Sequence, residues 1–172
     1  MRNVTTGQLT ADRWAEVEEL WAKDGLIRLA GSLQGPDPLA GRWRLHLVPA
    51  HPAPTTPRAW LSLRLRRRRT ARRRGPGPYD VTVSAGRFDV AVPVRDLTPP
   101  RPFRSERWDV RLVCHTVRTE VEMPVGRRLG RPRARAITYP AQCFTDGRGA
   151  RYRVRPRYTA DDRLLLVSRR VR

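Results

Sequence analysis

The chain has 172 residues and a formal net charge of +20, with 36 basic residues against 16 acidic ones. This length allows one domain with a core of its own, and a content of 39% hydrophobic residues excludes a mostly disordered chain. The charge excludes a polycationic ligand and favours an anionic one, although every basic residue except Lys23 is arginine, a bias that codon usage in a GC-rich genome also produces.

The first predicted element has two interpretations. Four apolar residues between Trp14 and Trp21 have helical spacing, and Thr10 fits the N-cap of a short helix over 11–23. The Asp24-Gly25 pair instead fits a tight hairpin turn between two strands, 20–23 and 26–33. We favour the hairpin and keep the short N-terminal helix as the alternative.

Alternation with a period of two dominates the rest of the chain. In each run one face is apolar and the other is polar, which is typical of antiparallel strands with one buried side. The runs that predict strands are 43–47, 61–65, 79–84, 88–94, 108–114, 117–123, 151–155 and 163–170. Turn residues such as Ala85-Gly86 and Asp146-Gly147-Arg148-Gly149 separate them. The predicted fold is all-β, with residues 1–172 forming a single two-sheet antiparallel, immunoglobulin-like sandwich of about ten short strands.

The most unusual segment is a run of arginines between Arg64 and Arg74. No acidic residue occurs between Asp37 and Asp80, and the prolines and glycines of 75–78 stop any helix or strand, so 66–78 is predicted to be an exposed, Arg-rich loop. The run either clamps a polyanion, such as a nucleic acid, lipid headgroups or a phosphate-bearing polysaccharide, or is a solvated loop without a ligand. Trp60 either stacks on a sugar ring or base or covers a sheet edge. The predicted binding residues are Arg64, Arg66, Arg67, Arg68, Arg69, Arg72, Arg73, Arg74 and Trp60.

Other patterns give little support for catalysis. Glu120 and Glu122 lie two residues apart, as an acid and base in sugar hydrolysis could, but Arg118 shares their polar face and favours a solvated charge ladder. The histidines and cysteines lack metal-ligand spacing. Without an export signal, Cys114 and Cys143 are predicted to be free, mostly buried thiols that pair only in an oxidising space. We therefore predict no enzymatic activity, no cofactor and no metal site.

Three motifs in the second half of the chain occur in a recognisable order. They are Gly86-Arg87-Phe88, Trp108-Asp109-Val110-Arg111-Leu112 and the closing Pro156-Arg157-Tyr158-Thr159. In this order, residues 79–172 resemble the C-terminal β-sandwich modules of bacterial family-2 glycosyltransferases that build wall polymers, including teichoic acid glycosyltransferases. Arg157 departs from the family pattern, because it separates the closing proline and tyrosine. The resemblance implies a non-catalytic immunoglobulin-like module for support, oligomerisation or polymer binding, with no active-site residues to carry over.

These observations lead to one first hypothesis and two alternatives. The first hypothesis is a non-catalytic accessory domain that binds an anionic wall polymer or its glycosyltransferase. The alternatives are a nucleic-acid-binding protein that uses the same arginines, and a structural scaffold whose charge is only compositional and which forms a stable homo-oligomer or a complex with a partner. No apolar run approaches the length that spans a bilayer, and residues 1–6 contain no apolar signal region. We therefore expect a cytoplasmic protein, either free or peripheral to the membrane.

Overall fold

A computed structural model describes residues 13–35, 40–50, 76–98, 105–117, 119–129 and 137–171 of the chain. Within these ranges 66% of the residues lie in strands and the one other regular element is a short 3-10 helix, which confirms the predicted all-β sandwich. In chain order the elements are β1 (Trp14–Lys23), β2 (Leu26–Gln34), β3 (Arg42–Pro49), β4 (Tyr79–Asp80), β5 (Thr82–Ser84), β6 (Arg87–Pro93), the short 3-10 helix η1 (Val94–Leu97), β7 (Ser105–His115), β8 (Glu120–Gly126), β9 (Gln142–Thr145), β10 (Arg151–Tyr158) and β11 (Leu164–Arg170).

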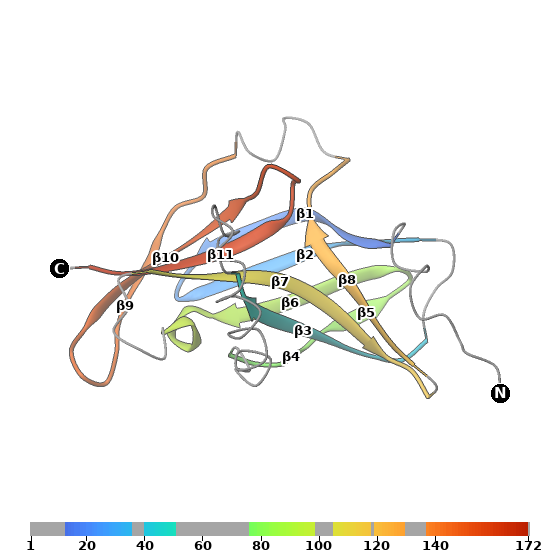
Figure 1. Ribbon diagram of the computed structural model, residues 1–172, viewed down its shortest axis with the longest axis horizontal. Helices are drawn as coiled ribbons and strands as arrows, with labels where there is room; N and C mark the ends of the chain where they lie inside the picture. The colour runs from blue at the N-terminus through green and yellow to red at the C-terminus, as the bar shows by residue number, and fades with distance from the viewer. Residues whose placement is uncertain are drawn as a thin grey trace, which may run out of the picture.

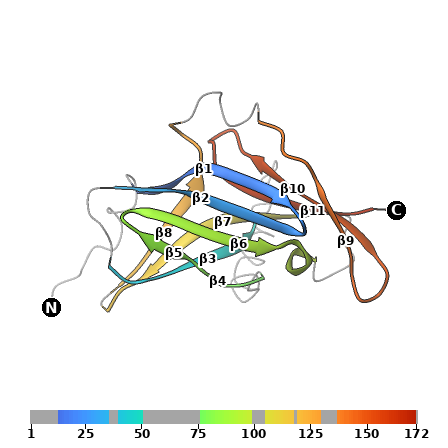
Figure 2. The same ribbon diagram turned by 180° about the vertical axis from the view of Figure 1, so that it is seen from behind.

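The strands form two layers that face each other (Figures 1 and 2). The first layer has the order β5-β6-β2-β1, and the second contains β9-β10-β11-β7, with β3 on the other side of β7 and β4 beside β3. β8 belongs to both layers, because residues 120–124 pair antiparallel with β7 and the end of the strand pairs parallel with β1. That parallel contact has two residue pairs, Ala15 with Val125 and Glu16 with Gly126.

The core lies between the two layers and follows from the alternation in the sequence. Trp43, Leu45 and Leu47 of β3 point inward, as predicted, and are at most 4% exposed. Ile27 and Leu29 of β2 meet them from the first layer as members of the same buried cluster. Burying each of these large side chains contributes about 1.5–3 kcal/mol. The other face of each strand is mostly polar, so a shift of one residue in the pairing would turn polar side chains into the core. Burial of the apolar face therefore fixes the register of the strands.

β1 is a strand, so the alternative of a short N-terminal helix is wrong. The Asp24-Gly25 turn closes the β1–β2 hairpin with positive φ at both residues, 53° and 75°, as a tight two-residue hairpin requires. The helical spacing in the sequence arises from a β-bulge, since the register of β1 against β2 shifts between Val17 and Glu19. One extra residue changes the inward positions from Ala15 and Val17 to Leu20 and Ala22, which leaves a three-residue interval.

Three strand predictions need correction. The run 117–123 begins too early, because Val117 is fully exposed in a turn and β8 starts at Glu120. The run 79–84 is broken at Val81, so that β4 pairs with β3 in one layer and β5 with β6 in the other. β9 was not predicted, because four residues are too few for a clear alternation. The predicted strand 61–65 lies outside the described residues.

The two cysteines have different surroundings. Both thiols are free; Cys114 is buried as predicted, and burial raises its pKa. The prediction was wrong for Cys143, which is exposed because it lies on the outer face of the edge strand β9. In the described part of the chain, no helix has both the length and the apolar character needed to cross a membrane.

Candidate functional site

The residues predicted to bind a ligand, the eight arginines from Arg64 to Arg74 and Trp60, lie outside the described residues. The role of this run, and the exposed loop predicted over 66–78, therefore stay predictions. The described residues contain a different concentration of positive charge, on the second layer of the sandwich.

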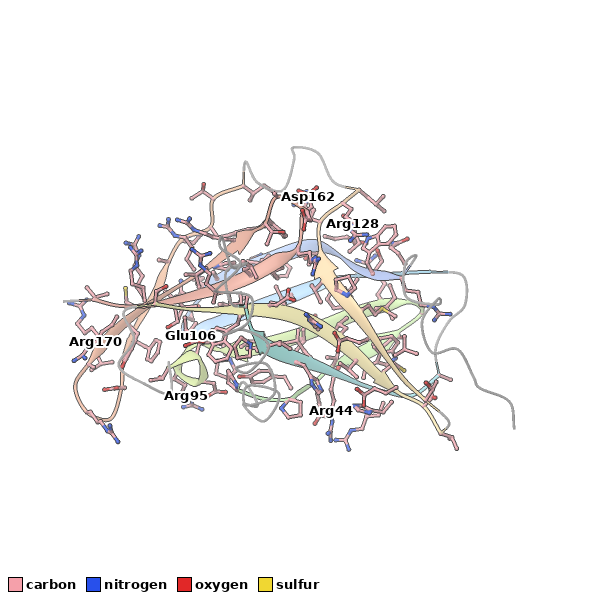
Figure 3. The ribbon with its side chains drawn as sticks, viewed as in Figure 1. Arg44, Arg95, Glu106, Arg128, Asp162 and Arg170 are labelled. Carbon is pink, nitrogen blue, oxygen red and sulfur yellow. The ribbon has the colours of Figure 1, made fainter. Side chains whose placement is uncertain are left out.

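β10 presents a row of arginines on its outer face. Tyr152, Val154 and Pro156 are buried, so the residues between them point away from the core. Arg169 on β11 lies directly opposite one of these arginines, and Arg107 on β7 is one strand further across the same face. We call this surface the β10 basic face; its members are Arg107, Arg151, Arg153, Arg155, Arg157 and Arg169. Figure 3 shows nitrogen-tipped side chains gathered along β10 and β11, towards the end of the molecule where Arg170 is labelled.

The β10 basic face has no acidic partner among the described residues. Their ion pairs lie elsewhere, for example between Arg42 and Asp80 at 3.0 Å and between Arg87 and Glu18 at 2.6 Å. Asp146, in the turn before β10, accepts hydrogen bonds from backbone N–H groups of its own turn, and the bond from Ala150 lowers the pKa of its carboxyl. None of the six arginines therefore forms an ion pair with a described acid, and Asp109, two residues from Arg107 on the same face of β7, is bound by Arg111.

This arrangement costs the fold free energy. Arg153 and Arg169 are directly opposed on neighbouring strands, where like charges are destabilising. Arg155 is half-buried, and its Nε atom is shielded from solvent without a hydrogen-bond acceptor. Leu165 and Val167 lie between the arginines as a half-buried apolar floor, on which arginine stems can pack. An anion bound here would reduce the repulsion, and a polyanion would do so for several arginines at once.

The outer surface of β9, β10 and β11 contains no aromatic residue. Phe144 and Tyr152 stack on each other with ring centroids 5.3 Å apart, but Tyr152 is buried on the inner face of β10. The face can therefore attract anions but offers no ring on which a base or sugar could stack.

A second polar cluster lies on the outer face of β7 and β8 and includes the two glutamates considered for hydrolysis. Arg111 forms ion pairs with Glu122 and with Asp109, the latter at 2.8 Å. Burial opposes the charge of Arg111, but these hydrogen bonds outweigh it and raise its pKa. His115 Nδ1 lies 3.3 Å from Glu120 Oε2. Both glutamates of β8 thus pair with side chains of the neighbouring strand β7, which is the charge-ladder arrangement favoured by the sequence.

The structure also brings together two histidines that are far apart in the sequence. The rings of His46 on β3 and His115 on β7 are 6.3 Å apart, and both Nε2 atoms are buried without a hydrogen-bond partner. Burial lowers the pKa of His46. Among the described residues no group of three or more histidine, cysteine or acidic side chains is arranged to hold a metal ion.

The sequence contained a signal for the β10 basic face that was not used. Residues 151–155 were predicted as a strand, and arginine occupies every second position from 151 to 157. This alternation places the four arginines on one face of a strand. The run at 64–74 has more arginines per residue and was therefore predicted as the binding segment instead. Arg107 and Arg169 could not be added without knowing the strand order.

Comparison with known proteins shows a similarity at the level of the fold. No protein-family model and no curated protein matches the chain. The crystal structure of S. aureus TarS is similar, with a TM-score of 0.61 and 15% sequence identity over 93% of this chain. The match covers 25% of TarS, so the chain spans about a quarter of the length of that protein. At this level of identity the similarity concerns the fold alone.

Proposed function

We propose that this chain is a non-catalytic accessory β-sandwich domain that acts with a wall-polymer glycosyltransferase and binds an anionic polymer. The observation that carries the proposal is the β10 basic face, six arginines on three adjacent strands without an acidic partner among the described residues. An anionic polymer supplies many charges on one chain, and releasing its counterions gives affinity that depends strongly on salt.

The fold provides the link to glycosyltransferases. TarS is a teichoic acid glycosyltransferase, and the chain matches about a quarter of it. This agrees with the resemblance of residues 79–172 to the sandwich modules of such enzymes. The association of Glu120 with His115 and of Glu122 with Arg111 supports a structural role for both carboxylates rather than a role in hydrolysis. We expect the domain to act in the cytoplasm, free or at the membrane surface.

The test is a calorimetric titration of the full chain with a polyol-phosphate polymer and with duplex DNA that contains the same number of phosphates. Each titration is run at about 150 mM and about 500 mM salt, where the Debye length falls from about 8 Å towards 4 Å. Tighter binding of the polymer at both salt concentrations supports the proposal. Tighter binding of DNA favours the nucleic-acid alternative, and no binding to either favours a structural scaffold.

A further inference from the structure

We propose that β10 is a linear track for a single phosphodiester chain in which three carbon atoms separate successive phosphates, as in a poly(glycerol phosphate). This inference rests on the proposed function and deepens it, because it assigns the binding residues and the spacing of the ligand. The track consists of Arg151, Arg153, Arg155 and Arg157, with Arg169 and Arg107 along one side.

The spacing of the arginines favours this ligand. Alternate residues of a strand are about 6.6–6.8 Å apart, so the four arginines of β10 span about 20 Å. Two residues of polypeptide contain six backbone bonds, and a phosphate repeat with three intervening carbons (P–O–C–C–C–O–P) also contains six. When both chains are extended, each phosphate can therefore face one arginine. A five-carbon repeat contains eight bonds and is about 9 Å long, so it places about one phosphate fewer along the same length.

The shape of the charged surface favours a single chain over a duplex. On the β9 side of the row, the outward residues opposite the arginines are the uncharged Cys143 and Thr145. On the other side, Val167 and Leu165 interrupt the arginines of β11 and β7. The positive charges thus form one line of four arginines along β10, with only two further arginines beside it. Duplex DNA has one charge per about 1.7 Å of its axis, far denser than this line, so most of its phosphates would lack a partner here.

The outer surface of β9, β10 and β11 has no aromatic side chain on which a base could stack, and this favours a polymer without bases. Single-stranded nucleic acid has a six-bond repeat too, but proteins that bind it combine a basic groove with aromatic side chains that stack on the bases. The outward residues of β9, β10 and β11 provide no such ring. A base-free phosphodiester needs only the charges, and the exposed nitrogens of an arginine fork suit its phosphate oxygens.

The experiment uses the full chain and two probes of equal phosphate number, an oligo(glycerol phosphate) and an oligo(ribitol phosphate). We expect the three-carbon probe to bind about three to five times more tightly, because it makes about one more exposed ion pair. For single strands the slope of log K against log salt is about −0.7 per phosphate, so we expect about −2.8 for the three-carbon probe and about −2.1 for the five-carbon probe. Equal or tighter binding of the five-carbon probe would overturn the spacing argument.

Variants separate this inference from the proposed function. We expect the double substitution Arg153→Gln and Arg155→Gln to weaken binding of the three-carbon probe about three- to tenfold and to reduce the salt slope by about 1.4. The matched control is Arg42→Gln with Arg44→Gln, two alternate arginines on β3 that both contact Asp80 and should leave the slope unchanged. An unfolding curve of each variant confirms that it is folded.

Each remaining outcome has a defined meaning. If the polymer binds but only substitution of the Arg64–Arg74 run weakens it, the β10 track is wrong and the proposed function stands. If single-stranded DNA of equal phosphate number binds more tightly than either polyol probe, the inference is overturned in favour of a nucleic acid. If no probe binds, both the inference and the proposed function fail.

Discussion

Replacing Glu16 should weaken the connection between the two layers of the sandwich. This side chain is only 4% exposed, and its carboxylate accepts three hydrogen bonds: from Trp14 Nε1 at 3.0 Å, from the backbone N–H of Arg128 at 2.9 Å and from that of Leu129 at 3.0 Å. The backbone ladder between β1 and β8 contains only two residue pairs. The Glu16 carboxylate extends this contact, because it accepts two hydrogen bonds from the backbone just after β8. Figure 3 labels Arg128 just beyond the end of β8, beside β1.

The magnitude follows from the three donors. Hydrogen bonds to a charged group contribute about 1.5–3 kcal/mol each, and donors left buried without an acceptor cost a similar amount. Partial access to water reduces the sum, so we expect Glu16→Ala to lower the free energy of unfolding by about 3–5 kcal/mol. Glu16→Gln keeps one acceptor oxygen and should lose about 2 kcal/mol, which leaves a folded protein to measure. Glu19→Ala, at an exposed position of the same strand, should change stability by less than about 0.5 kcal/mol.

The assay is urea unfolding combined with hydrogen exchange. The midpoint should fall while the denaturant slope stays constant, since the folded state keeps its overall burial. In Glu16→Gln at least one of the amides of residues 128 and 129 should exchange faster than those of the β1–β2 hairpin, because those two amides bond to different carboxylate oxygens and glutamine keeps only one. A midpoint for Glu16→Ala equal to that of Glu19→Ala, or unchanged protection at 128 and 129, would refute the reasoning.

Three further predictions test the packing, the titration and the exposure of single residues. Gly31→Ala should cost at least about 3 kcal/mol in a urea melt, because a Cβ there would collide with a backbone carbonyl of β1, whereas Gly147→Ala, with open space around it, should cost less than about 1 kcal/mol; equal costs would contradict this packing. Because burial lowers the pKa of His46, the unfolded state binds the proton more readily, so stability should fall as the pH drops below about 6.5, and His46→Gln should flatten this slope in unfolding curves between about pH 7 and 5; an unchanged slope would show that other groups cause it. A thiol reagent should label Cys143 in the native protein within minutes and Cys114 only after unfolding, and simultaneous labelling would argue against the buried position of the latter.

The strands were predictable where one residue in two is apolar, as in β3 and β7, or where a two-residue turn joins two partner strands, as in the β1–β2 hairpin. The bulge in β1 was not predictable, because an extra residue in a strand produces the same three-residue interval as a helix turn. The crossing of β8 from one layer to the other was also hidden, since it depends on two residue pairs with β1, more than a hundred positions earlier in the chain.

The candidate site shows a similar division between local and non-local information. The alternation of arginines along β10 is local and could have been found from the sequence. The direct opposition of Arg153 and Arg169 depends on register, and the position of Arg107 depends on β11 lying beside β7. The approach of His46 to His115 likewise required the pairing of β3 with β7. A linear run such as Arg64–Arg74 is conspicuous in a sequence, but a surface assembled from alternate residues of three strands is not.

The distribution of the acidic residues bears on whether the charge of this protein is only compositional. A GC-rich genome explains why arginine replaces lysine, but it does not remove aspartate or glutamate, since both have codons with two G or C bases. Only Asp12 and Asp37 of the 16 acidic residues lie outside the described part of the chain. Elsewhere in the sandwich several arginines meet acids of neighbouring strands, as Arg28 does with Asp89, which lowers the pKa of that carboxyl. Codon usage would act on every strand alike, so it does not account for one face where six arginines have no such partner. The anionic ligand proposed above would account for it, because a carboxylate placed there would compete with the ligand for the same guanidinium groups.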